Sequence, residues 1–137
     1  MGANVAAGQT AILLIDDDEL IAGSLRHFLQ ARGCAVTVAA ETGAAIARME
    51  AGRYAVVVVD PYLTASGLAD RLSLVRTTRE LQPEASLIVL TAYASPELER
   101  ELAGYAVSAV LTKPQPVSVL GQIVAAATNR SNEFRQC

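Results

Sequence analysis

Short runs of apolar residues recur along the chain at nearly regular intervals, and stretches with helical spacing separate them. The runs have the length of strands and cover residues 11–15, 35–39, 55–59, 87–90 and 108–111. The third run contains four successive valines, so this strand has no polar face. A strand that is apolar on both faces is typical of a parallel sheet covered by helices on both sides.

Between these runs, apolar residues return every three or four positions, as they do along one face of a helix. The spacing predicts five helices, whose apolar positions span residues 20–29, 44–49, 68–81, 98–102 and 120–127. Two helices have clear start signals: Asp18 can cap the first, and Ser95-Pro96-Glu97 supplies a cap, a first-turn proline and an acidic residue for the fourth.

Strands that alternate with helices predict an α/β fold: a doubly wound parallel sheet of five βα units with right-handed crossovers. Five units suit the flavodoxin-like strand order 2-1-3-4-5. We expect a leader over residues 1–10, one domain over residues 11–129 and a polar tail over residues 130–137.

Composition narrows the class of protein further. The chain has 137 residues, of which 52% are apolar, enough for a single core and too many for a disordered chain. Its net charge is −3, and no run of Lys and Arg gathers on a predicted helix, which argues against direct nucleic-acid binding. Cys34 and Cys137 match neither a disulfide framework nor metal-ligand spacing, so they indicate a reducing compartment. With no signal peptide and no membrane-spanning segment, we expect a cytoplasmic protein.

Carboxylates follow two of the predicted strands at the edge where such folds bind ligands. Asp16-Asp17-Asp18 follows the first strand and Asp60 follows the third. In the expected strand order these two strands are neighbours, and their carboxyl ends meet at the switch point of the sheet. Like charges brought so close are costly unless a cation offsets them, and Mg²⁺ prefers carboxylate, carbonyl and phosphate oxygens. The sequence therefore predicts a magnesium site.

The same edge carries groups suited to phosphoryl chemistry. Asp60 can act as a nucleophile toward phosphorus. Lys113, after the fifth strand, can supply a positive charge to a phosphate oxygen, and Thr91, at the end of the fourth, can supply a hydroxyl. Each residue alone is a weak signal, but their ordered occurrence after the first, third, fourth and fifth strands is specific.

These residues resemble the receiver domain of two-component response regulators, in the CheY-like superfamily, over about residues 10–129. The motifs are Ile-Leu-Leu-Ile-Asp-Asp-Asp (12–18), Val-Val-Val-Val-Asp (56–60), Ile-Val-Leu-Thr-Ala (88–92) and Leu-Thr-Lys-Pro (111–114). The resemblance implies that Asp60 accepts a phosphoryl group from a sensor histidine kinase or a phosphotransfer protein. Such a domain is a signalling switch and not an enzyme that acts on an external substrate.

The resemblance also assigns roles around the acceptor. Asp16 and Asp17 would hold Mg²⁺ together with the Asp60 carboxylate and the backbone carbonyl of Tyr62. Thr91, Ala92 and Lys113 would contact the phosphoryl group and pass the change to the face of the fourth helix, fifth strand and fifth helix. The same face could serve a homodimer, but the sequence leaves the oligomeric state open. Pro114 would follow a cis peptide bond, as X-Pro bonds in tight turns can.

The sequence departs from the family pattern near the acceptor and on the fifth strand. Leu63-Thr64 stands where Met-Pro is usual, Gly67 comes one residue early, and Pro61 directly follows Asp60. Val110 stands three residues before Lys113, where the family usually has the aromatic partner of the switch threonine. The segment 67–91 is about one helical turn longer than usual.

Two tyrosines are further candidates for the site. Tyr62 and Tyr93 each lie two residues after a predicted site residue, Asp60 and Thr91 respectively. They either flank the phosphoryl group and shield it from water or are surface aromatics without a role.

Three other functions compete with the phosphorylated switch. Val110, Pro61 and the altered loop favour a pseudo-receiver, an interaction module that works without phosphorylation. The intact set of Asp16, Asp17, Asp60, Thr91 and Lys113 argues against it. An aspartate-nucleophile phosphatase would need a second Asp two residues after Asp60, where Tyr62 stands. A dinucleotide-binding fold would need a Gly-x-Gly-x-x-Gly motif after the first strand, and that motif is absent.

Overall fold

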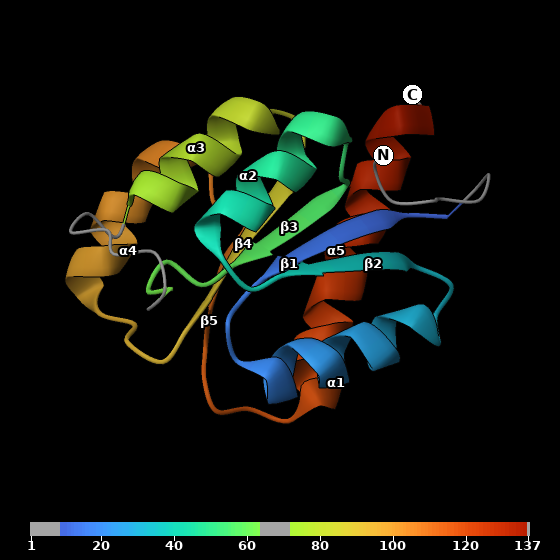
Figure 1. The fold of residues 1–137 in the computed structure, drawn as a ribbon, viewed down its shortest axis with the longest axis horizontal. Helices are drawn as coiled ribbons and strands as arrows, with labels where there is room; N and C mark the ends of the chain where they lie inside the picture. The colour runs from blue at the N-terminus through green and yellow to red at the C-terminus, as the bar shows by residue number, and fades with distance from the viewer. Residues whose placement is uncertain (1–8, 64–71, 137) are drawn as a thin grey trace.

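The computed structural model describes residues 9–63 and 72–136, with side chains as far as residue 128. Strands and helices alternate along the chain, and the helices lie on both faces of one sheet (Figure 1). In chain order the elements are β1 (Ala11–Ile15), α1 (Glu19–Gln30), β2 (Ala35–Ala39), α2 (Thr42–Ala51), β3 (Val56–Val59), α3 (Ser73–Leu81), β4 (Ser86–Thr91), α4 (Pro96–Leu102), the short 3₁₀ helix η2 (Ala103–Tyr105), β5 (Ala109–Thr112) and α5 (Val117–Gln136).

The five strands are parallel and lie in the order β2-β1-β3-β4-β5, as the sequence predicts. The predicted bounds of β1 and β2 are confirmed; those of β3 differ by one residue at one end, and those of β4 and β5 by one residue at both ends. Because β1 and β3 are neighbours, the residues that follow them are brought together at one edge of the sheet.

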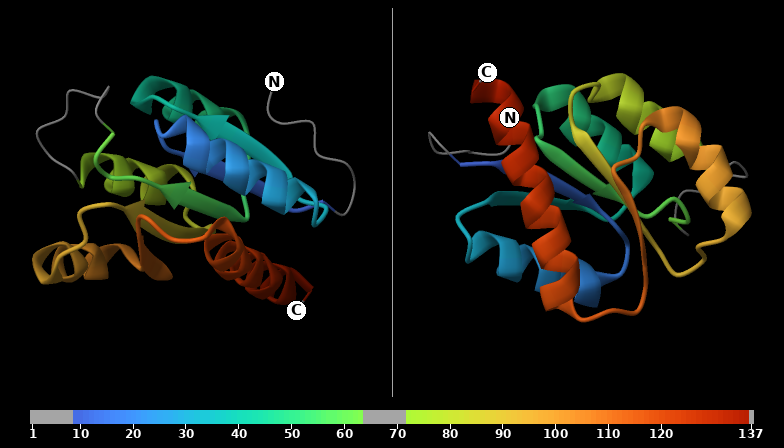
Figure 2. Two further views of the ribbon diagram at one scale, coloured as in Figure 1. Left: turned by 90° about the horizontal axis from the view of Figure 1, so that it is seen from below. Right: turned by 180° about the vertical axis from the view of Figure 1, so that it is seen from behind.

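Alternate residues of the central strands point into two separate cores. On one face, Leu13, Val57 and Val89 pack with buried side chains of α2, α3 and α4. On the other face, Leu14 and Val58 pack with those of α1 and α5. The rear view in Figure 2 shows α5 lying across this second face beside α1. Burial on both faces explains why the β3 run Val56–Val59 has no polar position.

Two predicted helix starts are confirmed by their capping hydrogen bonds. Asp18 Oδ1 accepts a hydrogen bond from the Ile21 amide at 3.2 Å, and Ser95 Oγ accepts one from the Leu98 amide at 3.1 Å. Within the described residues the third helix spans Ser73–Leu81, and positions 68–71 of its predicted range lie outside the described residues. The backbone of α5 stays helical through the polar stretch to Gln136.

Candidate functional site

Asp16, Asp60 and Lys113 each come directly after a strand, where backbone hydrogen bonds continue the sheet. The Asp16 amide donates to the Ala39 carbonyl at 3.1 Å, and the Asp60 amide donates to the Ile15 carbonyl at 2.9 Å. The Lys113 amide donates to the carbonyl of Thr91, also at 2.9 Å. These bonds fix where the side chains leave the backbone, so their positions do not depend on long flexible loops.

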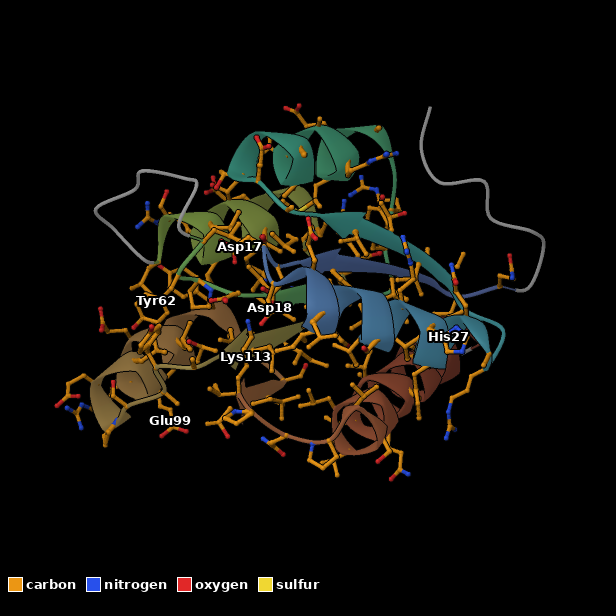
Figure 3. The ribbon with its side chains drawn as sticks, turned by 60° about the horizontal axis from the view of Figure 1, so that its bottom comes forward. Asp17, Asp18, His27, Tyr62, Glu99 and Lys113 are labelled. Carbon is orange, nitrogen blue, oxygen red and sulfur yellow. The ribbon has the colours of Figure 1, made fainter. Side chains whose placement is uncertain are left out.

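Lys113 lies between the carboxylates that follow β1 and β3. Its Nζ atom is 2.8 Å from Asp16 Oδ2 and 3.0 Å from Asp60 Oδ2. All three side chains are buried, each with at most 10% of its surface exposed. Figure 3 shows Lys113 at the same edge of the sheet as Asp17 and Tyr62. The predicted grouping of Asp16, Asp60 and Lys113 is therefore present.

Burial raises the pKa of the Asp16 carboxyl above its ordinary value, although Lys113 and the Asp18 amide pull it in the opposite direction. Burial opposes the charge of Lys113 as well, but its contacts with Asp16 and Asp60 outweigh that cost and raise the pKa of the ammonium group. Lys113 is therefore a cation held in place by two carboxylates that it does not fully offset.

The carboxylates of Asp16, Asp17 and Asp60 could together hold a metal ion. One oxygen atom from each lies within 4.8 Å of the others, and Asp17 is the most exposed of the three. The buried Asp16 Oδ2 has the Lys113 ammonium as a charged neighbour but no well-aligned hydrogen-bond donor among the described residues. Three carboxylates with too few hydrogen-bond donors around them fit a hard divalent cation such as Mg²⁺, which binds oxygen ligands.

Asp60 and Thr91 each accept a side-chain hydrogen bond from the backbone amide two residues later, which stabilises a turn beside the site. Asp60 Oδ1 accepts a hydrogen bond from the Tyr62 amide at 2.9 Å, and Thr91 Oγ1 accepts one from the Tyr93 amide at 3.0 Å. The two tyrosine rings meet edge to face, with centroids 5.3 Å apart and planes at 77°. The equal spacing of the tyrosines marks them in the sequence, but nothing in it indicates that the rings touch.

The remaining predicted residues surround these groups. Thr91 is the last residue of β4 and is fully buried, while Ala92 after it is exposed. The Lys113–Pro114 peptide bond is cis, as the family resemblance implies. On β5, the half-buried Val110 pairs with Val89. Thr64 and Gly67, two of the unusual positions after Asp60, lie outside the described residues.

Comparison with known proteins identifies the family. The family model of the response regulator receiver domain matches residues 12–125, and the chain belongs to this family of signalling modules. A search of curated proteins found no significant match.

Solved structures show the same fold. A CheY-like receiver domain protein from Methanospirillum hungatei JF-1 is 24% identical with a TM-score of 0.83, over 93% of this chain and 99% of that one. A response regulator from Burkholderia pseudomallei, solved with a phosphorylated aspartic acid, calcium ion and citrate, is 32% identical with a TM-score of 0.75, over 93% of this chain and 72% of that one. The chemotaxis protein CheY4 of Vibrio cholerae is 23% identical with a TM-score of 0.75, over 88% and 99% of the two chains.

The part of the chain that the structure describes contains no helix both long and apolar enough to cross a lipid bilayer.

Proposed function

We propose that this receiver domain is switched by transfer of a phosphoryl group to Asp60 from a phosphohistidine of a sensor kinase or phosphotransfer protein. The observation that carries the proposal is the contact of Lys113 Nζ with Asp60 Oδ2 at 3.0 Å, beside two further carboxylates. The change at Asp60 would alter the face of α4, β5 and α5, through which the domain binds its partners or a second copy.

The transfer requires little from the protein beyond position and charge. A carboxylate oxygen of Asp60 attacks the phosphorus; the new O–P bond forms while the N–P bond of the donor breaks, and the imidazole nitrogen keeps the electron pair. The Lys113 ammonium and the Thr91 hydroxyl then face the phosphoryl oxygens. Both are buried, so their charge and dipole act in a region that water screens poorly.

Asp16, Asp17, Asp60 and the Tyr62 carbonyl would hold Mg²⁺ in this domain. The ion would supply positive charge to the oxygens of the transferred group. The excess of carboxylates over Lys113 supports this assignment. So does the 32% identical Burkholderia protein, which carries a phosphorylated aspartic acid and a calcium ion.

Intact-mass spectrometry with a small acyl-phosphate donor tests the proposal. We expect the full chain to gain the mass of one phosphoryl group when the donor and Mg²⁺ are both present. The variant Asp60→Asn, which keeps the side chain's size but loses the nucleophile, should gain none. A gain that persists in Asp60→Asn, or no gain in the unchanged chain, would overturn the proposal.

A pseudo-receiver that works without phosphorylation is the second candidate. It is favoured by Val110 on β5, which gives Thr91 no aromatic partner on that strand. It predicts no mass gain under the same conditions, so the one experiment separates the two functions.

A further inference from the structure

The edge-to-face contact between Tyr62 and Tyr93 joins the segment after β3 to the segment after β4. Tyr62 lies in the loop that leads from β3 toward α3, and Tyr93 lies in the loop between β4 and α4. The ring centroids are 5.3 Å apart. The contact is therefore a direct connection between the acceptor loop and the segment that precedes α4.

Each tyrosine is also tied to a side chain whose partners change if Asp60 is phosphorylated. The Tyr62 amide donates to Asp60 Oδ1, and the Tyr93 amide donates to Thr91 Oγ1. A phosphoryl group bonded to Asp60 would weaken the carboxylate as an acceptor for the Tyr62 amide. Its oxygens would accept a hydrogen bond from the Thr91 hydroxyl, which reorients the Oγ1 atom that the Tyr93 amide contacts. Both loops would then be displaced, and the ring contact would make them move together.

The segment from Ala92 to the end of α4 buries few side chains against the rest of the molecule. Tyr93 itself is 68% exposed, and Ala92 and Ala94 beside it are exposed too. In α4, which begins at Pro96, only Leu98 and Leu102 are buried. A helix held by two side chains can shift when the loop before it shifts.

No residue of β5 is aromatic, so this strand has no ring that could change its position when the Thr91 hydroxyl moves. Val110 is half-buried, packs against the core on the α4 side of the sheet and pairs with Val89. A valine side chain has one stiff rotatable bond and cannot swing between a buried and an exposed position as an aromatic ring can.

We infer that the Tyr62–Tyr93 contact couples phosphorylation of Asp60 to a shift in the position of α4 in this protein. The inference rests on the proposed function, since it concerns what phosphorylation does after it has occurred. The Tyr62 and Tyr93 side chains act here as positioning groups: the two rings couple the movement of the two segments and do not contact the reacting atoms.

The test is an NMR comparison of the backbone amides of residues 96–102 before and after treatment with an acyl-phosphate donor and Mg²⁺. Tyr62→Leu, Tyr93→Leu and the double variant remove one or both rings, and Tyr93→Phe keeps the ring without its hydroxyl. Leu20→Ala is the matched control, because it removes another exposed apolar side chain, which is 79% exposed on α1. Spectra are compared at equal phosphorylated fraction, read from intact mass.

We expect the α4 shifts to fall about threefold or more in each Leu variant, and to fall no further in the double variant, because one contact is lost in all three cases. Tyr93→Phe and Leu20→Ala should keep the full shifts. Undiminished shifts in the Leu variants, or losses that add in the double variant, would overturn the coupling and leave the proposed function intact. If the unchanged chain gains no mass, the proposed function fails, and the coupling fails with it.

Discussion

Both carboxylate oxygens of Asp60 have partners, and these partners determine what the residue can do. Oδ1 closes the turn to Tyr62, and Oδ2 faces Lys113. The sequence predicts that Asp60 and Lys113 meet, because each directly follows a strand of a parallel sheet. It cannot assign an oxygen to a partner, since that choice depends on side-chain rotamers set by the packed structure.

The first prediction concerns the two tyrosine rings as a shield. Replacing Tyr62 with Asn or Tyr93 with Ala should shorten the lifetime of phosphorylated Asp60 severalfold, because water would reach the phosphorus more easily. Tyr93→Phe, which keeps the ring, should preserve the lifetime. The measurement is loss of the phosphoryl mass with time after the donor is removed. Unchanged lifetimes in the Asn and Ala variants would show that the rings do not shield the site.

The second prediction concerns the buried charge of Asp16. Asp16→Asn should stabilise the chain without divalent ions by about 1 kcal/mol, because the burial of the Asp16 charge costs more than its contact with Lys113 returns. Lys113 keeps Asp60 as its partner in this variant. The same variant should lose most of the stabilisation that Mg²⁺ gives the unchanged chain, since one ligand is gone.

Urea unfolding at neutral pH, with and without MgCl₂, measures both effects. Glu84→Gln is the matched control: Glu84 is exposed and lies before β4, at the opposite end of the strand from Thr91, so this variant should change neither value. A destabilised Asp16→Asn in metal-free buffer would contradict the net cost of the buried Asp16 charge. An undiminished response to Mg²⁺ would contradict the assignment of Asp16 as a metal ligand.

The third prediction concerns the thiol of Cys34, which is remote from the acceptor. Burial raises its pKa above the ordinary value, and Arg32 only partly opposes this. The folded chain therefore keeps the thiol proton at a pH where the unfolded chain has lost it. The free energy of unfolding is therefore unaffected by this thiol below the pKa of an unfolded cysteine, about 8.5, and falls as the pH rises from there through the higher pKa of the folded chain.

Unfolding free energies at neutral and alkaline pH test this prediction. The loss of stability on raising the pH should be smaller in Cys34→Ala than in the unchanged chain. Equal losses would mean that the thiol does not titrate differently in the two states.

At the scale of elements, the fourth prediction concerns the packing of α1 against α5. A Cβ atom on Gly121 would run into the Phe28 ring, which is half-buried and stacked against the Arg32 guanidinium at 4.6 Å. Gly121→Ala should therefore destabilise the fold by about 1–3 kcal/mol. Gly23→Ala is the matched control: its Cβ meets nothing, and it should stabilise α1 by about 0.5–1 kcal/mol.

Chemical denaturation of both variants measures the difference. Adding Phe28→Leu to Gly121→Ala should recover part of the loss, because it removes the ring that the new methyl group meets. A Gly121→Ala chain as stable as the original would contradict the packing described between these helices.

The strands and the capped helices could be predicted because their signals are local. Other features depend on segments far apart in the chain. The buried Gln82 side chain accepts a hydrogen bond from the Tyr54 amide and donates to the Met49 and Gly52 carbonyls, which ties the end of α2 to the end of α3. Arg79 donates to five backbone carbonyls, in the turns before β4 and β5. A sequence pattern does not indicate such partners.

At the scale of the whole molecule, the parallel sheet explains why one edge can serve as the site. Every strand ends there, so residues 16, 60, 91 and 113 are brought together although long segments separate them. The sequence predicts this convergence and the acidic cluster within the net charge of −3. The contact between the Tyr62 and Tyr93 rings was not predictable, because it depends on the paths of two loops.

Locating the phosphoryl group on the chain shows whether Asp60 is the acceptor. After treatment with an acyl-phosphate donor, borohydride reduces an aspartyl phosphate to an alcohol, and peptide mass spectrometry then finds the altered residue. The account predicts a single altered position, Asp60, when donor and Mg²⁺ are both present, and none when either is omitted. Modification at Asp16 or Asp17 instead, or an unaltered Asp60 peptide in the complete mixture, would contradict it.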